Sequence, residues 1–353
     1  MLRFHLPCAA ALIQLILAGS GLQPALAQQP AEKQSSGPPP QSEGVPRTLT
    51  PQDYPAWNIS NDAQTLITEA LKGGDYQYVE NTLAKLIEQN PNSPQLLTFL
   101  ARVFFLDNKP LNCAIALKKA EKLGPLKESE QFTLALCYVI LKRLDWAADE
   151  FERLAHSYPG NALYPYWQGR IAYDNYAYAE AVARFNKALR LDPEMVRAYD
   201  NLGLCYEGMS DNQRAVENYE RAVTLNRSKS PSSPWPPLNY GMLLLKQGSL
   251  EQAEPLLQEA ARLGPGLAQA RCQLGVLLAK QERHADAIAE LQKAAELDPS
   301  YPQPHLTLAH VYRRLGEKGK AEAELAAFQK LKQAQEDQDK QTGATPPGEK
   351  RPK

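Results

Sequence analysis

Residues 201–206 read Asn-Leu-Gly-Leu-Cys-Tyr, and they begin the spacing that decides the fold of this chain. A second small residue, Ala215, follows Gly203 after twelve positions, and the aromatic Tyr219 follows four positions later. Small residues at such spacing allow two helices to approach closely, while the large residue fills the remaining space. The same order of small, small and large residues returns at Gly275, Ala287 and Leu291.

Prolines mark the period of this pattern. They recur at intervals of 34 residues at Pro91, Pro125, Pro159 and Pro193, and the same interval separates Pro265 from Pro299. Between Pro193 and Pro265 lie two periods plus four residues, and the extra four fit the Ser/Pro-rich segment 230–233. Because proline cannot continue a helix and disfavours helix in the residue before it, each of these prolines is predicted to follow a helix end.

Small residues keep the same register along the chain. Position 8 of each period holds Ala101, Ala135, Gly169, Gly203, Gly241, Gly275 and Ala309. Position 20 holds Cys113, Ala147, Ala181, Ala215, Ala253, Ala287 and Ala321.

The pattern resembles the tetratricopeptide repeat, a pair of antiparallel helices with the signature L-G-x-x-Y, then A-x-x-x-F, then P. The resemblance covers residues 60–335 and divides them into eight repeats: 60–93, 94–127, 128–161, 162–195, 196–233 with the insertion, 234–267, 268–301 and 302–335. It implies an all-α solenoid, a right-handed superhelix of antiparallel helix pairs. Ile67 and Val79 replace the small residues in the first repeat, as is common for a terminal repeat.

The N-terminus has the features of an export signal. Arg3 precedes an apolar stretch from about Leu6 to Ala18, and Ala25-Leu26-Ala27 has the small-x-small form that signal peptidase accepts. The apolar stretch is shorter than the roughly 20 residues that span a membrane. We therefore predict a signal peptide over 1–27 that is cleaved after Ala27, export to the periplasm or the extracellular space, and no integral membrane span after cleavage.

Two polar segments flank the repeats. Residues 28–59 are rich in Pro, Gln and Ser, and residues 336–353 are polar with three prolines. Such segments bury too little apolar surface to offset the entropy of ordering. Both are predicted to be disordered, the first as a linker and the second as a tail.

The sequence offers no catalytic pattern. It contains no GxxxxGK[ST], GxGxxG, GxSxG or HExxH motif, and its net charge of -1 argues against a nucleic-acid binder. We predict no enzyme activity, no cofactor and no metal. Four cysteines follow the predicted signal: Cys113, Cys137, Cys205 and Cys272. Their pairing stays open, although an oxidising compartment would permit a Cys113–Cys137 disulfide.

The resemblance implies that the first helix of each repeat lines a concave groove. The residues predicted to bind a partner there are Arg102, Tyr166, Trp167, Arg170, Tyr173, Arg197, Asn201 and Asn239. Aromatic and Arg side chains are enriched at binding hot spots. The amides of Asn201 and Asn239 could pair with the backbone of an extended peptide, since each has a donor and an acceptor. The alternative for every one of these residues is packing between neighbouring repeats.

The function predicted from the whole pattern is that of an exported scaffold that binds a partner protein or an extended peptide. The alternative is a module for a non-protein ligand such as a cell-wall glycan, because aromatic side chains also stack on sugars. Self-association through a free end of the solenoid stays open. The partner is not identified by the sequence, since one fold serves many functions.

Overall fold

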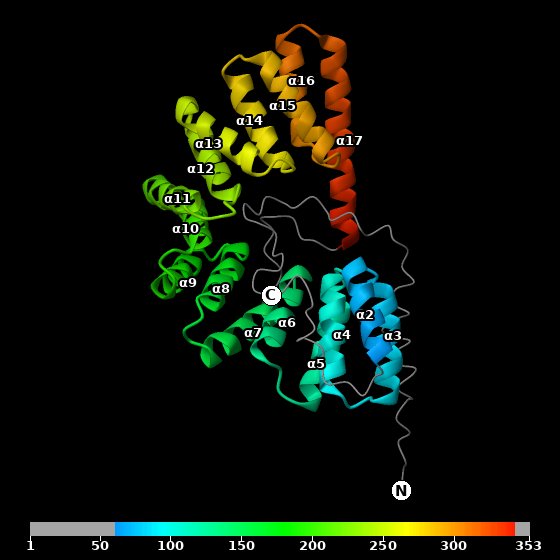
Figure 1. The fold of residues 1–353 in the computed structure, drawn as a ribbon. Helices are drawn as coiled ribbons and strands as arrows, with labels where there is room; N and C mark the ends of the chain where they lie inside the picture. The colour runs from blue at the N-terminus through cyan, green and yellow to red at the C-terminus, as the bar shows by residue number, and fades with distance from the viewer. Residues whose placement is uncertain (1–60, 343–353) are drawn as a thin grey trace. The chain divides into compact units, whose positions relative to one another are not determined.

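The computed structural model describes residues 61–342, with side chains for 64–337. This part of the chain forms sixteen helices and no strand, which confirms the all-α tetratricopeptide solenoid fold (Figure 1). Residues 1–60 and 343–353 lie outside it. The signal peptide over 1–27 and the whole of the linker over 28–59 therefore stay predictions.

The described residues form two compact units that divide between Tyr176 and Ala177. The first unit contains α2 (Asn61–Gly73), α3 (Tyr76–Gln89), α4 (Pro94–Leu106), α5 (Pro110–Leu123), α6 (Glu128–Ile140), α7 (Leu144–Ser157) and α8 (Leu163–Asp174). The second contains α9 (Tyr178–Leu191), α10 (Val196–Gly208), α11 (Asn212–Arg227), α12 (Trp235–Gln247), α13 (Leu250–Leu263), α14 (Ala268–Lys280), α15 (His284–Leu297), α16 (Gln303–Arg314) and α17 (Lys318–Thr342). The sequence predicts one domain over 60–335. A solenoid permits a division at any hairpin, because each repeat contacts only its neighbours.

The periodic prolines end the second helix of a pair, as predicted. Helix α9 ends at Leu191, Asp192 caps it, and Pro193 follows. Helix α15 ends in the same way at Leu297, with Asp298 as cap and Pro299 next. Other prolines start helices instead, since a missing N–H costs little in the first turn. Pro94 and Pro110 are the first residues of α4 and α5.

In every turn between the two helices of a pair, one residue adopts the left-handed backbone conformation. It stands at position 15 of each period, with positive φ angles at Gly74, Asn108, Lys142, Tyr176, Ser210, Gly248, Glu282 and Gly316. Only three of these residues are glycine, the residue that adopts this conformation without strain. The sequence analysis did not predict this turn, because most of the residues that form it are not typical of it.

The small residues explain how closely the paired helices pack. A Cβ atom added at Gly203 on α10 would lie 2.5 Å from the ring of Tyr219 on α11. Gly275 on α14 meets Leu291 on α15 in the same way, at 2.6 Å. The large residue at position 24 therefore covers the small residue at position 8 of its own hairpin. Tyr219 also reaches the next hairpin, where its ring stacks on that of Tyr240 with centroids 6.1 Å apart.

The four-residue insertion lies between α11 and α12, as predicted. Helix α11 runs on to Arg227, and the loop that follows is closed by Asn226, which is only 2% exposed. The Asn226 Nδ2 donates to the Ser233 carbonyl at 2.7 Å, and the Ser233 N–H donates to Asn226 Oδ1 at 2.8 Å. One buried amide thus satisfies both polar groups of the loop backbone that it meets.

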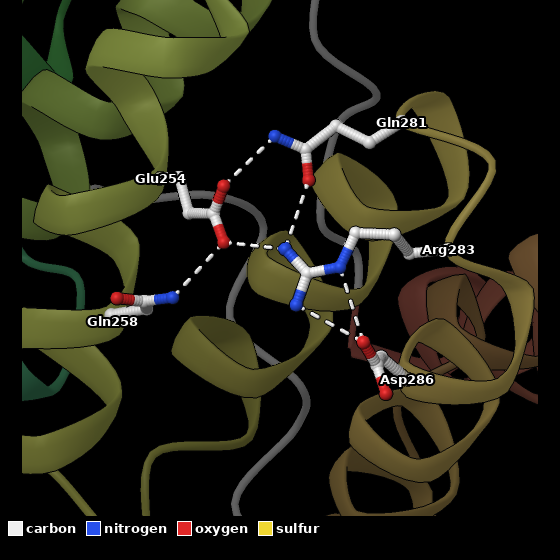
Figure 2. Close-up of polar contacts among 5 residues, drawn as sticks. All are labelled: Glu254, Gln258, Gln281, Arg283 and Asp286. Carbon is white, nitrogen blue, oxygen red and sulfur yellow. Dashed lines mark hydrogen bonds and ion pairs between the residues drawn. The ribbon is translucent and has the colours of Figure 1, made fainter.

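An ion pair recurs between neighbouring repeats at one register, from position 16 of a repeat to position 21 of the repeat before it. In the first unit, Lys109 Nζ lies 2.9 and 2.8 Å from the two carboxylate oxygens of Glu80, which is 2% exposed. In the second unit, Arg283 Nη1 donates to Glu254 Oε1 at 2.6 Å (Figure 2). Figure 2 also shows Gln281 donating to Glu254 and Arg283 pairing with Asp286. These contacts lower the pKa of the Glu254 carboxyl, Gln281 first and Arg283 second.

The predicted tail boundary is wrong. Helix α17 continues past residue 335 to Thr342, so the start of the segment 336–353 is helical. The physical reason is composition, because residues 318–342 contain no proline and after Gly319 no glycine, and Ala, Gln, Lys and Glu favour helix. None of the helices that the structure describes is long and apolar enough to cross a membrane.

Candidate functional site

Helix α8 carries four of the residues predicted to bind a partner, and it is an unusually buried helix. Nine of its twelve residues are buried, among them Tyr166, Trp167 and Arg170. Tyr173 is half-buried at the C-terminal end of the same helix. The sequence of α8 has little amphipathic character, because large side chains occupy several of its faces.

The aromatic residues of α8 form a cluster with α7. The ring of Trp167 stacks on that of Phe151, with centroids 5.8 Å apart and an interplanar angle of 8°. Tyr166 meets the Trp167 ring edge-on at 5.7 Å. The indole nitrogen Nε1 of Trp167 is buried and has no hydrogen-bond acceptor among the described residues. A buried N–H without an acceptor costs about 1–3 kcal/mol, so the packing of this cluster has to offset an unmet donor.

Arginine 170 adds charge beside this cluster. Its guanidinium lies 5.8 Å from the centroid of the Tyr173 ring and 3.9 Å from the Asp174 carboxylate. Tyr166, Trp167, Arg170 and Tyr173 thus all lie on α8, and the stacking of Trp167 on Phe151 of the preceding repeat is the packing that was considered as the alternative to partner binding. Partner binding by these residues stays a prediction. Arg102 stands on α4 at position 9 of its repeat, the position that Arg170 occupies in its own repeat, and it is half-buried.

The predicted residues of the second unit lie on α10 and α12. Asn201 Nδ2 donates to the Arg197 carbonyl at 2.7 Å. Asn239 Nδ2 donates to both carboxylate oxygens of Asp200, at 3.1 and 3.0 Å. Asn201 is 0% exposed and Asn239 is 3% exposed. Burial lowers the pKa of the half-buried Arg197 to about 10, because desolvation disfavours its charged form.

These contacts bear on the role expected for the two asparagines. Their Nδ2 groups already donate within the protein, because a buried amide has to satisfy its hydrogen bonds locally. Pairing of Asn201 and Asn239 with the backbone of a bound peptide stays a prediction. The sequence analysis did not single out Asp200 as the partner of Asn239, although the two stand 39 residues apart on neighbouring first helices.

The sequence analysis also missed Trp146, because it considered only the first helix of each repeat. Trp146 stands on α7, a second helix, and 56% of it is exposed. The same register position holds a polar residue in most other repeats, such as Glu180, Arg214 and Asp286. A tryptophan at a position that is otherwise polar is the signal that could have revealed it.

The four cysteines that the structure describes are buried free thiols: Cys113, Cys137, Cys205 and Cys272. Burial and the neighbouring Cys137 raise the pKa of the Cys113 thiol well above its ordinary value. Among the side chains described, no group of three or more His, Cys, Asp or Glu is placed to hold a metal ion.

The stacked hairpins show that this is a helical-repeat protein. Proteins of this class have extended surfaces that bind other molecules. Models of the tetratricopeptide repeat match residues 166–234, 238–302 and 278–339. Together with the hairpin fold, these matches show that the chain is built from tetratricopeptide repeats. Members of this family are generally scaffolds rather than enzymes.

Curated relatives match about a quarter to a third of this chain. Tetratricopeptide repeat protein 36 of Danio rerio is 32% identical over 89 residues, which are 25% of this chain and 48% of that protein. Its counterpart in Homo sapiens is 31% identical over 107 residues, 30% of this chain and 57% of that protein. The chain thus spans about half the length of the curated relatives that it matches.

Two solved structures share the fold. Yeast Tom70 is 20% identical with a TM-score of 0.57, over 83% of this chain and 68% of that one. The APC/C hetero-tetramer Cut9-Hcn1 is 16% identical with a TM-score of 0.56, over 69% of this chain and 48% of that one. At these identities the likeness concerns the fold alone.

Proposed function

We propose that the chain is an exported scaffold that binds a partner protein, and that the α8 surface of Tyr166, Trp167, Arg170 and Tyr173 takes part in binding. The fold supports the class of function, since tetratricopeptide repeats serve protein–protein contact. Arg102 would extend the surface on α4. Arg197, Asn201 and Asn239 form a second candidate surface on α10 and α12.

One observation carries the assignment of α8: the buried Nε1–H of Trp167 has no acceptor among the described residues. A backbone carbonyl of an extended segment would supply that acceptor once the side chains that cover the buried indole edge move aside. The guanidinium of Arg170 would take an acidic side chain, since charge-assisted hydrogen bonds are the strong ones. Tyr173 would cover an apolar side chain.

The first test removes the indole N–H donor of Trp167 and keeps an aromatic ring at this position. Trp167→Phe removes the indole N–H but preserves most of the packing on Phe151. We expect the free protein to be as stable as the wild type or more stable by about 1 kcal/mol, because an unmet buried donor is removed. Capture of the partner should fall at the same time. Denaturant unfolding and crosslinking pull-down from the native compartment give the two readouts.

A pair of matched double variants locates the surface. Arg170→Ala with Tyr173→Ala alters α8, whereas Tyr78→Ala with Arg190→Ala makes the same two changes at exposed positions on α3 and α9. The proposal predicts loss of the captured protein with the first variant alone. Equal capture by both variants, with intact helical circular dichroism, would place binding elsewhere.

The alternative function, binding of a cell-wall glycan, is supported less by the packing of the aromatic cluster than by the sequence alone. One face of the Trp167 ring is already stacked on Phe151, which leaves less aromatic surface for a sugar. If the wild type captures no protein, binding to isolated cell-wall glycan becomes the next measurement.

Export has its own test. Cell fractionation and N-terminal sequencing of the native protein should find Gln28 as the first residue in an exported fraction. A protein that keeps Met1–Ala27 inside the cell would contradict this part of the proposal.

A further inference from the structure

A second surface with the features of a binding site lies between α5 and α7 of the first unit. Both are second helices of their repeats, whereas α8 is a first helix. This surface is a groove of about 560 Å³ between two second helices, with the C-terminal end of α6 at its base. It shares no residue with the α8 surface.

Large apolar side chains that remain in contact with solvent line this groove. Leu111 is 57% exposed, Ile115 is 37% exposed and Trp146 is 56% exposed. The Trp146 ring is held in place, with Tyr138 edge-on at 5.4 Å and the Arg143 guanidinium 5.7 Å from its centroid. Exposed apolar side chains gathered in one hollow mark an interaction site, and tryptophan is one of the residues enriched at the hot spots of such sites.

The charged lining of the groove is entirely basic. Lys118 pairs with Glu121 outside it. Lys119, Lys122 and Arg143 also line the groove or its rim, and none of the three has an ion pair within the described part of the chain. Burial and the nearby charge of Lys122 lower the pKa of Lys119. Like charges this close repel each other, so a carboxylate bound between them would relieve the repulsion.

The repeat register explains why Arg143 has no carboxylate partner. Arg143 occupies position 16 of its repeat, where Lys109 and Arg283 pair with Glu80 and Glu254 of the preceding repeat. The residue at the matching position before Arg143 is Ala114, which lines the groove. The carboxylate that pairs with Lys109 and with Arg283 is therefore replaced at this register by the side chain of an alanine that lines the groove.

We propose that the groove between α5 and α7 binds an acidic amphipathic helix of a partner protein, with an Asp or Glu of that helix on Arg143. The groove side of α5 runs from Leu111 through Ile115 to Lys122, a stripe roughly 16 Å long at the helical rise, or three turns. A helix with apolar residues at matching spacing packs lengthwise into such a groove. A flat membrane would contact the exposed rim but not the carboxylate position beside Ala114.

The test selects 16-residue peptides from a displayed library on the full wild-type chain, and Trp146→Ala is kept for the affinity measurements alone. Selected peptides should carry Leu, Phe or Trp at three- and four-residue spacing together with Asp or Glu. Their affinity, measured by fluorescence anisotropy, should fall about tenfold or more with Trp146→Ala and should weaken as salt is raised.

Ala114→Glu supplies the missing carboxylate from within the chain. We expect it to reduce peptide affinity about tenfold, while Ala114→Gln, which fills the same space without charge, retains affinity within about threefold. Lys119→Glu with Lys122→Glu should also abolish binding, whereas the same changes at the exposed Lys293 and Lys330 should not. Circular dichroism confirms that each variant is folded.

Three results would overturn the proposal. Enriched peptides that are basic or neutral would contradict the charge assignment, and binding that ignores Trp146→Ala would place the site elsewhere. Failure to enrich any peptide, combined with Trp146-dependent binding to phosphatidylserine vesicles, would assign the groove to a membrane surface. None of these results bears on the α8 surface, which has separate variants.

Discussion

At the scale of single residues, contact distances determine which positions tolerate change. Gly203 lies directly under the Tyr219 ring, so that even one methyl group has no room there. Gly266 has no neighbouring atom within 4 Å of an added Cβ. The identity of the residue, glycine in both cases, does not distinguish the two positions, whereas the packing does.

Gly203→Ala is expected to lower the free energy of unfolding by about 2–3 kcal/mol, because overpacking forces the ring of Tyr219 or a helix to move. Gly266→Ala serves as the control and should change it by less than about 0.5 kcal/mol. Urea denaturation of both variants checks this. Equal effects would mean that α10 and α11 are not as close as described.

The Cys113 thiol should be inert in the folded protein. Burial raises its pKa, so little thiolate is present near pH 8, and the side chain is 0% exposed. Iodoacetamide should therefore modify Cys113 only at the rate at which the structure opens, and rapidly in guanidinium chloride. Mass spectrometry of timed samples measures this, and fast modification of the native protein would contradict the packing of α5.

At the scale of the helical elements, the sequence predicts where helices end better than it predicts the turns between the two helices of a pair. The prolines fix the ends of α9 and α15 through a local steric effect that can be read from one residue. The left-handed turn residue has no such signature. At Lys142, Tyr176 and Glu282 the surrounding hairpin imposes a conformation that the residue itself disfavours.

Glu282→Gly is expected to raise the free energy of unfolding by about 1 kcal/mol, because glycine adopts the left-handed conformation without the penalty of a Cβ atom. Gly248→Ala, at the same position of the preceding repeat, should lower it by about the same amount. Thermal and urea unfolding of the two variants should thus shift in opposite directions. Shifts of the same sign would exclude turn strain as the cause.

At the scale of the whole molecule, the sequence predicts the class of fold and much less of the site. The period of 34 residues determines which helices pair, and the resemblance to the tetratricopeptide repeat identifies their first helices. Which polar groups are free to bind a partner depends on contacts between residues far apart in the chain. Asn239 donates to Asp200, 39 residues away, and no local pattern indicates that pair. Trp146 was missed for a different reason: only the first helix of each repeat was considered, although a tryptophan at a register position that is otherwise polar is visible in the sequence.

The central claim, that the α8 surface contacts a partner protein, is tested most directly by photocrosslinking in the native compartment. Benzoylphenylalanine would replace Tyr173 on α8, or Tyr78 on α3 as the matched control, since both are tyrosines near the surface of a helix. The account predicts one discrete protein crosslinked from position 173 and absent from position 78. The same crosslinked products from both positions, or none from position 173 while the chain still captures its partner, would contradict it.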